Sequence, residues 1–146
     1  MKRLFTALLL PACMLAAISH AGSSSGEDEG YLITALLKSR FDKPEALLQV
    51  APVSIVSDHA LVGWVQGENG GRALLQKLSG KWQLQLCGGD GLKQESVLIQ
   101  AGIEPSQAHD LATKAVEAEA ALPAVFVRKL SRFSGTMTMA PEEAAH

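Results

Sequence analysis

Cysteine is almost absent from this chain of 146 residues, which contains only Cys13 and Cys87. Two cysteines are too few for the disulfide framework that stabilises many small exported proteins. Cys13 lies in an N-terminal segment that we expect to be cleaved off. The mature chain then keeps a single thiol, Cys87, which cannot close an internal disulfide.

A surplus of basic residues is also missing. The chain has 13 Lys and Arg residues against 15 Asp and Glu residues, and its formal net charge is −2. Loss of Lys2 and Arg3 with the N-terminal segment makes the charge of the mature chain about −4. A mildly acidic surface without a basic stripe argues against nucleic acid and anionic membranes as partners.

Motifs of the common catalytic sites are missing too. We find no nucleophile elbow, no metalloprotease motif and no obvious pair of carboxylates. The stretch Gly88–Gly91 matches neither the dinucleotide-binding nor the P-loop pattern and is typical of a tight strand-to-helix turn. One catalytic alternative is a thiol nucleophile at Cys87 with His59 as its base and Asp58 or Asp90 to orient that base. It requires an exposed thiol near the base, and we expect a protein that is not an enzyme.

The first 21 residues have the three parts of a Sec-type signal peptide. A basic start precedes an apolar run over Leu4–Ile18, and small residues stand at positions −3 and −1 before a cleavage point after Ala21. Pro11 interrupts the run, which is too short for a membrane span. Because Pro11 also spoils the lipobox before Cys13, we expect no lipidation there. The chain is expected to be exported, with no stable membrane insertion after cleavage.

Removal of this signal leaves about 125 residues, the usual size of one domain. Residues 22–30 are expected to form a flexible leader, because they begin with the Gly/Ser-rich stretch Gly22–Gly26. Residues 31–139 are expected to form a single α+β domain, and residues 140–146 a disordered tail.

Helical periodicity occurs before and after the centre of the chain. The first predicted helix, Tyr31–Phe41, places Ile33 and Leu37 on one face. A second helix is predicted over Leu92–Ala101, with Asp90 as its N-cap.

A third helix is predicted to begin at Pro105, which suits the first turn, and to end before Pro123. Its apolar stripe contains several alanines and Val116, whereas Glu119 is predicted to lie off the stripe.

The centre of the chain is typical of antiparallel strands joined by short turns. Asn69-Gly70 is a strong hairpin signal, and similar turn residues precede and follow it. The turns define a four-stranded meander: Pro52–Val56, Ala60–Gln66, the segment from Gly71 to Leu78, and Trp82–Cys87. A short edge strand at Leu48 and Val50 is expected to end at Pro52.

In the last of these strands, simple alternation predicts Trp82, Leu84 and Leu86 on one face and Cys87 on the opposite face. Phe133–Met139 is predicted as one more strand. The fold class is therefore α+β: an N-terminal helix, an antiparallel four-stranded meander covered on one face, and C-terminal helices. This arrangement also resembles cystatin-like domains.

Sulfur-bearing side chains are the best candidates for chemistry. Cys87 ends a strand beside a glycine-rich turn, where a thiol can bind a soft metal ion; a buried structural cysteine and an intermolecular disulfide are the alternatives. Met137 and Met139 are two residues apart on a predicted strand, so both thioethers point the same way and suit Cu(I). Their alternative role is to fill a gap in the core. The histidines have no metal-site spacing and are typical of surface positions: His59, His109 and His146.

A series of short motifs runs through the chain in a fixed order. The motifs are Arg40-Phe41-Asp42-Lys43-Pro44-Glu45, Ala60-x-x-Gly63-Trp64-x-Gln66-Gly67, Gly70-Gly71-Arg72-Ala73-Leu74-Leu75, Trp82-x-x-x-Leu86-Cys87-x-Gly89-Asp90-x-Leu92 and Phe133-x-Gly135-Thr136. In this order they resemble the copper uptake system-associated proteins, a family of small exported proteobacterial proteins. The resemblance covers approximately residues 31–139.

The resemblance implies a non-catalytic periplasmic role in copper uptake or homeostasis, with the copper-uptake machinery as partner. The resemblance assigns no ligand residues; that Cys87, Met137 and Met139 bind the copper, with His146 as a further candidate, is our own hypothesis from their sulfur chemistry. The alternative is a metal-free periplasmic binding module that uses the sheet face around Trp64 for a protein partner or an apolar ligand. Copper binding predicts that the sulfur atoms meet, whereas the alternative predicts an apolar patch or a lined cavity.

Overall fold

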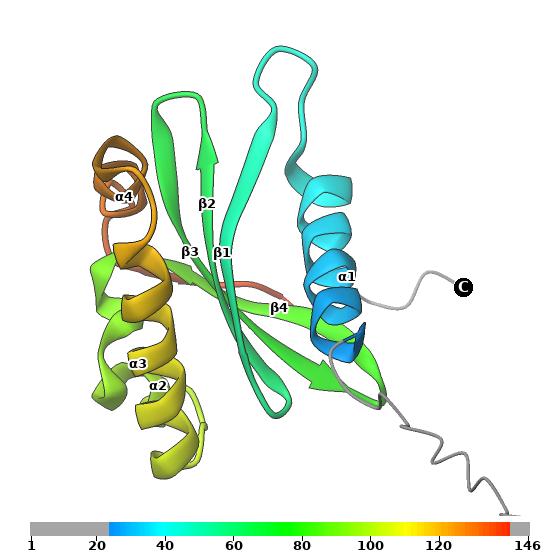
Figure 1. The fold of residues 1–146 in the computed structure, drawn as a ribbon, viewed down its shortest axis with the longest axis vertical. Helices are drawn as coiled ribbons and strands as arrows, with labels where there is room; N and C mark the ends of the chain where they lie inside the picture. Colours follow the sequence, from blue (N-terminus) through cyan, green and yellow to red (C-terminus); the bar gives the residue numbers. More distant parts are fainter. Residues whose placement is uncertain (1–23, 141–146) are drawn as a thin grey trace, which may run out of the picture.

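A computed structural model describes residues 24–140 of the chain. One antiparallel sheet lies between a single helix on one face and a group of helices on the other (Figure 1). The predicted α+β class is confirmed. The predicted signal peptide over residues 1–21, with Cys13, lies outside the described residues, as do residues 141–146 of the predicted tail.

The sheet is a meander in which the strands lie side by side in chain order. Its strands are β1 Leu48–Val56, β2 His59–Gln66, β3 Asn69–Leu78, β4 Lys81–Gly88 and β5 Thr136–Thr138. The four predicted strands are confirmed, and the turns between them contain positive φ angles at Ser57, Gly67 and Gly80. The fifth strand lies within the predicted Phe133–Met139 segment and pairs with β4 at the sheet edge.

The first strand, β1, continues through Pro52. Its pairing with β2 is interrupted between Val50 and Val53, where the Ala51–Pro52 peptide bond is cis. The prediction that Pro52 ends a short edge strand is wrong, because an irregularity at a sheet edge accommodates a residue that lacks an N–H.

The fourth strand, β4, contains one extra residue. The register with β3 shifts at Gln85, and a bulge of this kind reverses the faces of the residues that follow it. Leu84 and Cys87 therefore pack on the same side as Trp82, whereas Leu86 packs on the other. The prediction that Cys87 lies opposite Trp82 and Leu84 is wrong for this reason.

The helix α1, Ser24–Phe41, covers one face of the sheet. It begins earlier than predicted, so residues 24–30 of the expected flexible leader are helical instead. The carboxylate of Glu29 accepts hydrogen bonds from the indole N–H of Trp82 and, at 2.5 Å, from Lys77. These contacts hold the first turns of α1 against the sheet and explain why the helix extends into the Gly/Ser-rich stretch.

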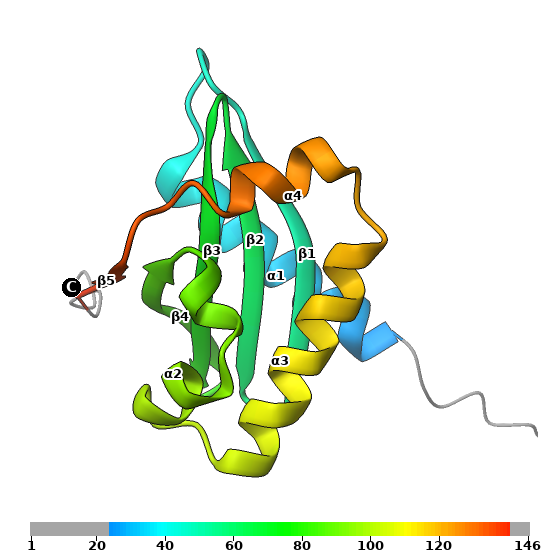
Figure 2. The same cartoon turned by 90° about the vertical axis from the view of Figure 1, so that its left-hand side faces the viewer.

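Three shorter elements lie on the opposite face: the 3-10 helix η1 Asp90–Lys93, α2 Glu95–Gln100 and α3 Pro105–Ala120 (Figure 2). Helices therefore cover both faces, and the prediction of cover on one face is wrong. Asp90 is not the N-cap of a long helix, because it begins η1 and Gln94 precedes α2.

The helix α3 begins at Pro105 as predicted, after Glu104, whose side chain accepts a hydrogen bond from the Ser106 backbone N–H. Two positions on it differ from the predicted pattern. Val116 is 51% exposed, and Glu119 is only 5% exposed. Glu119 turns inward because it pairs with the buried Arg72.

The last helix, α4 Ala124–Leu130, follows Pro123 and packs against β2 and β3 (Figure 2). The chain then crosses to the α1 side of the sheet, where Phe133 and Met139 pack on the core under α1. Among the helices of the described residues, none is both long and apolar enough to cross a membrane.

Candidate functional site

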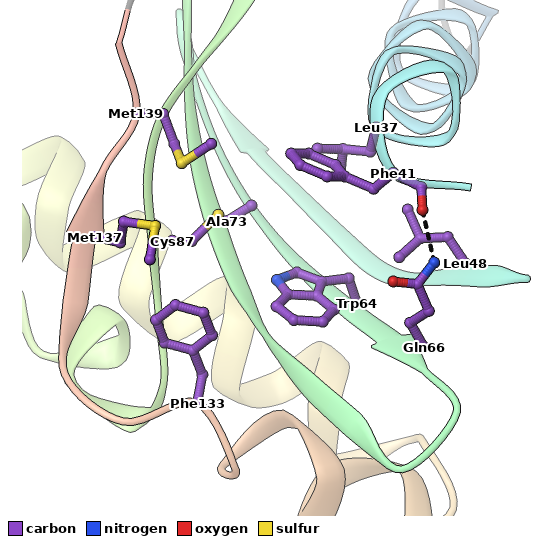
Figure 3. A pocket seen from close by; sticks show the side chains of 10 residues that line it. All are labelled: Leu37, Phe41, Leu48, Trp64, Gln66, Ala73, Cys87, Phe133, Met137 and Met139. Carbon is purple, nitrogen blue, oxygen red and sulfur yellow. Dashed lines mark hydrogen bonds between the residues drawn. The ribbon is translucent and has the colours of Figure 1, made fainter. Parts of the chain in front are cut away.

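A pocket of about 180 Å³ lies between the C-terminal part of α1 and the sheet (Figure 3). We call it the α1 pocket. Ten side chains line it, three of them carry sulfur, and none carries a formal charge at neutral pH. They are Leu37, Phe41, Leu48, Trp64, Gln66, Ala73, Cys87, Phe133, Met137 and Met139.

All three predicted sulfur ligands line this pocket. Cys87 and Met137 are direct partners across the β4–β5 pair, so their side chains extend to the same face. Met139 follows two residues later, and its backbone N–H donates a 2.8 Å hydrogen bond to the carbonyl of Gln85. Alternation along the strand returns its side chain to that face. The fold thus brings Cys87, Met137 and Met139 to one wall of the α1 pocket (Figure 3).

The thiol of Cys87 is free and only 8% exposed. Burial raises the pKa of this thiol from its ordinary 9.0 to about 11, because apolar surroundings disfavour the thiolate. The thiol is therefore protonated at neutral pH. A thiol nucleophile needs an accessible thiolate near a base, and His59 does not line the pocket. The geometry does not support the catalytic alternative.

Phe133 closes one end of the pocket because glycines allow it to approach the sheet. Its ring meets Trp64 edge to face, with centroids 6.1 Å apart and an interplanar angle of 81°. A Cβ atom at Gly71 would lie 2.9 Å from the Cβ of Phe133, and one at Gly89 would clash with the Phe133 carbonyl oxygen. The Gly70-Gly71 and Gly88-Gly89 pairs therefore do more than form turns, because they leave room for this segment.

Two polar groups point into the pocket. The Nε2 of Gln66 donates to the carbonyl oxygens of Phe41 at 2.6 Å and Ala46 at 2.8 Å. Since both amide hydrogens are used, the Oε1 of Gln66 is left facing the pocket (Figure 3). The indole nitrogen of Trp64 lies at the edge of its ring that faces away from Gln66 (Figure 3), and within residues 24–140 neither group has a hydrogen-bond partner.

The histidines lie elsewhere. His109 contacts Glu95 at 2.5 Å on the surface, and the hydrogen bond to this carboxylate raises the pKa of His109. His59 begins β2, and His146 lies outside the described residues. In the part of the chain that the structure describes, no three His, Cys, Asp or Glu side chains form a group that could hold a metal ion. A metal site there depends on methionine sulfur.

Sequence reasoning did not assign Gln66 or Phe133 to a site. Gln66 could have been recognised from the sequence, because it is the polar residue at the end of an alternating strand face that otherwise holds Ala60, Val62 and Trp64. The only sequence feature that marked Phe133 was its place in the Phe-x-Gly motif, because the residues that it contacts are distant in the chain.

No family model, no curated protein and no solved structure matches the chain. The resemblance to copper uptake system-associated proteins therefore stays a prediction, and the α1 pocket is the structural feature that bears on function.

Proposed function

We propose that this protein is a non-catalytic accessory protein of copper uptake and homeostasis that binds Cu(I) through Cys87, Met137 and Met139. It acts in the periplasm after export, with the copper-uptake machinery as its partner. The observation that carries the proposal is the common position of the three sulfur side chains on one wall of the α1 pocket.

The chemistry of these ligands supports a soft monovalent ion. Thiolate and thioether sulfur prefer Cu(I), whereas carboxylate and carbonyl oxygen prefer harder ions such as Mg²⁺ and Ca²⁺. No carboxylate or imidazole is among the residues that line the pocket. The donor set therefore fits copper in its reduced state.

The charge of the pocket supports the same ion. An apolar pocket disfavours net charge, and Cu(I) with one thiolate and two neutral thioethers has a net charge of zero. A divalent ion with the same ligands would keep one uncompensated positive charge. Because the pKa of the Cys87 thiol is about 11, binding at neutral pH releases the thiol proton.

Exposure of the ligands supports exchange with a partner. Met137 is 55% exposed, whereas Cys87 is 8% exposed. A thioether at the surface and a thiol in the pocket give copper a path between a partner protein and the interior, by exchange of one ligand at a time.

A competition titration tests the proposal. The protein is titrated with Cu(I) against a chelator of known affinity, together with C87S, M137L and M139L variants. Each variant is expected to bind Cu(I) at least about tenfold more weakly, which corresponds to about 1.4 kcal/mol for the lost ligand.

A T138V variant is the control, because Thr138 lies between the two methionines and alternation turns its side chain to the other face of β5. Its Cu(I) affinity is expected to equal that of the parent protein. Unchanged affinity in both C87S and M139L would remove these residues from the site.

A further inference from the structure

We propose that Met137 is a modification site: in the folded protein a peroxide oxidises its thioether to the sulfoxide before the Cys87 thiol reacts, and methionine sulfoxide reductases reverse the change. This inference goes beyond copper binding, because it rests on the exposure and the pairing of the sulfur side chains and needs no metal.

Access to solvent distinguishes Met137 from the other sulfur side chains of residues 24–140. Met137 is 55% exposed and lies on β5, whose three residues are all exposed at the sheet edge. Its cross-strand partner Cys87 is only 8% exposed, and Met139 packs on the core under α1. A peroxide that arrives from solvent therefore meets the Met137 thioether first.

Burial also removes the usual advantage of a thiol over a thioether. A cysteine reacts with peroxide as the thiolate, which is the nucleophilic form. The pKa of the Cys87 thiol is raised to about 11 by burial, so only about one thiol in ten thousand is ionised at pH 7. A thioether has no proton to lose before it reacts. Both access and ionisation therefore place Met137 ahead of Cys87.

The reaction transfers one oxygen atom. A lone pair of the Met137 sulfur attacks one oxygen of hydrogen peroxide, and the O–O bond breaks as the S–O bond forms. The proton on the transferred oxygen passes to the other oxygen, which leaves as water. The sulfur loses two electrons and the peroxide gains two. In the reverse direction a reductase supplies two electrons from thiols, and the oxygen leaves as water.

The position of Met137 allows the folded protein to keep the sulfoxide. Oxidation makes the side chain polar, and at an exposed residue the new oxygen can face water. The same oxygen on Met139 would need burial against the core under α1. The sulfoxide at position 137 therefore stays accessible to a reductase. It also removes one of the three sulfur donors of the proposed copper site.

Peptide mass spectrometry after peroxide treatment tests the proposal. The full-chain protein is kept metal-free with a chelator at pH 7 and treated with hydrogen peroxide for increasing times. The oxygen gained at Met137, Met139 and Cys87 is then measured. We expect Met137 to react at least about tenfold faster than Cys87 and several times faster than Met139. In urea the two methionines are expected to react at equal rates, because their exposure no longer differs.

First oxidation at Cys87 or Met139, or the same order of rates in the folded and the urea-unfolded protein, would overturn the proposal. Two matched variants sharpen the test. M139L is expected to keep the rate of Met137 oxidation within about twofold. In M137L, neither Met139 nor Cys87 is expected to react in the time that Met137 needs in the parent protein. If either reacts that fast, Met137 is not a distinct site.

Reversal is measured on the protein that has gained one oxygen. Its melting temperature is expected to lie within about 2 °C of the parent value, because the oxygen faces water. The two types of methionine sulfoxide reductase, one for each sulfoxide epimer, are expected to remove the oxygen with a thiol as reductant. Unfolding on oxidation, or a sulfoxide that both reductases leave unchanged, would contradict a reversible site. A failed Cu(I) titration leaves these results unaffected, because no metal is present.

Discussion

One extra residue decides where the only described thiol lies. Without the bulge at Gln85, strict alternation from Trp82 and Leu84 would turn Cys87 to the opposite face of the sheet, under η1, α2 and α3. With the bulge, Cys87 lies in the core under α1 and beside Met137. The candidate copper site therefore depends on a local irregularity of β4 as much as on the identity of the sulfur residues.

The buried thiol should make the stability of the fold depend on alkaline pH. The pKa of Cys87 is about 11 in the folded protein and near 9.0 when the thiol is exposed, so the unfolded state loses its proton first as the pH rises. The buried thiol contributes its full stabilisation below pH 9. As the pH rises to 11, this contribution to the free energy of unfolding falls by about 2 to 3 kcal/mol.

Urea denaturation of the parent protein and a C87A variant, measured at several values between pH 8 and pH 11, isolates this contribution. The two unfolding free energies should converge as the pH rises, because the variant has no thiol to ionise. A difference that does not change with pH would mean that the thiol is not buried in solution.

At the scale of elements, the short strand β5 places both candidate methionines. Its three residues are exposed, and a strand of this length has little stability of its own. It pairs with β4 on one side, and the segment before it rests on glycine positions through Phe133. Met137 and Met139 therefore reach the α1 pocket only because Phe133 can lie close to the sheet.

A methyl group at Gly89 should displace this segment. A Cβ there clashes with the Phe133 carbonyl oxygen, so G89A is expected to destabilise the fold by about 1 to 3 kcal/mol. It is also expected to speed hydrogen exchange of the Met139 amide, which bonds to Gln85. Urea denaturation and hydrogen exchange measure the two effects.

G91A is the matched control, because a Cβ at Gly91 meets no atom within 4 Å. Its stability is expected to remain within about 0.5 kcal/mol of the parent protein. Equal stability of the two variants would show that the segment at Phe133 does not need the glycine.

At the scale of the whole molecule, a buried arginine joins the sheet to the helical layer. Arg72 of β3 is fully buried, and its guanidinium donates to both carboxylate oxygens of Glu119 on α3, at 2.6 and 2.8 Å. It also donates to Asp90 of η1 at 3.0 Å and to the carbonyl of Leu130 at the end of α4, at 3.3 Å. One side chain therefore contacts three helical elements, and through α4 it supports the segment that reaches β5.

Removal of the partner carboxylate should leave a buried positive charge with too few compensating contacts. We expect E119A to reduce the free energy of unfolding by about 3 to 5 kcal/mol. Glu117 lies on the same helix and is exposed, so E117A is expected to cost no more than about 0.5 kcal/mol. Thermal or denaturant unfolding compares them, and a similar small effect of both changes would exclude a structural role for the Arg72–Glu119 pair.

The sequence by itself determined the class of the fold and the type and order of most elements. The turns that bound β2, β3 and β4, the helix start at Pro105 and the fifth strand near Met137 all follow from local patterns, because turn geometry and side-chain periodicity depend on neighbouring residues. The scarcity of cysteine and the position of Cys87 beside two C-terminal methionines also pointed to sulfur as the chemistry to examine.

Only the tertiary structure decided which face Cys87 occupies, that Glu119 turns inward, and that Phe133 closes a pocket with Trp64. Each depends on groups far apart in the chain, as with Arg72 and Glu119, which are 47 residues apart. Strand register, buried ion pairs and the close approach of backbone to glycine arise when segments pack together, so a local pattern does not contain them. The α1 pocket has the same origin, because α1, four strands of the sheet core and the C-terminal segment meet there only after the chain has folded.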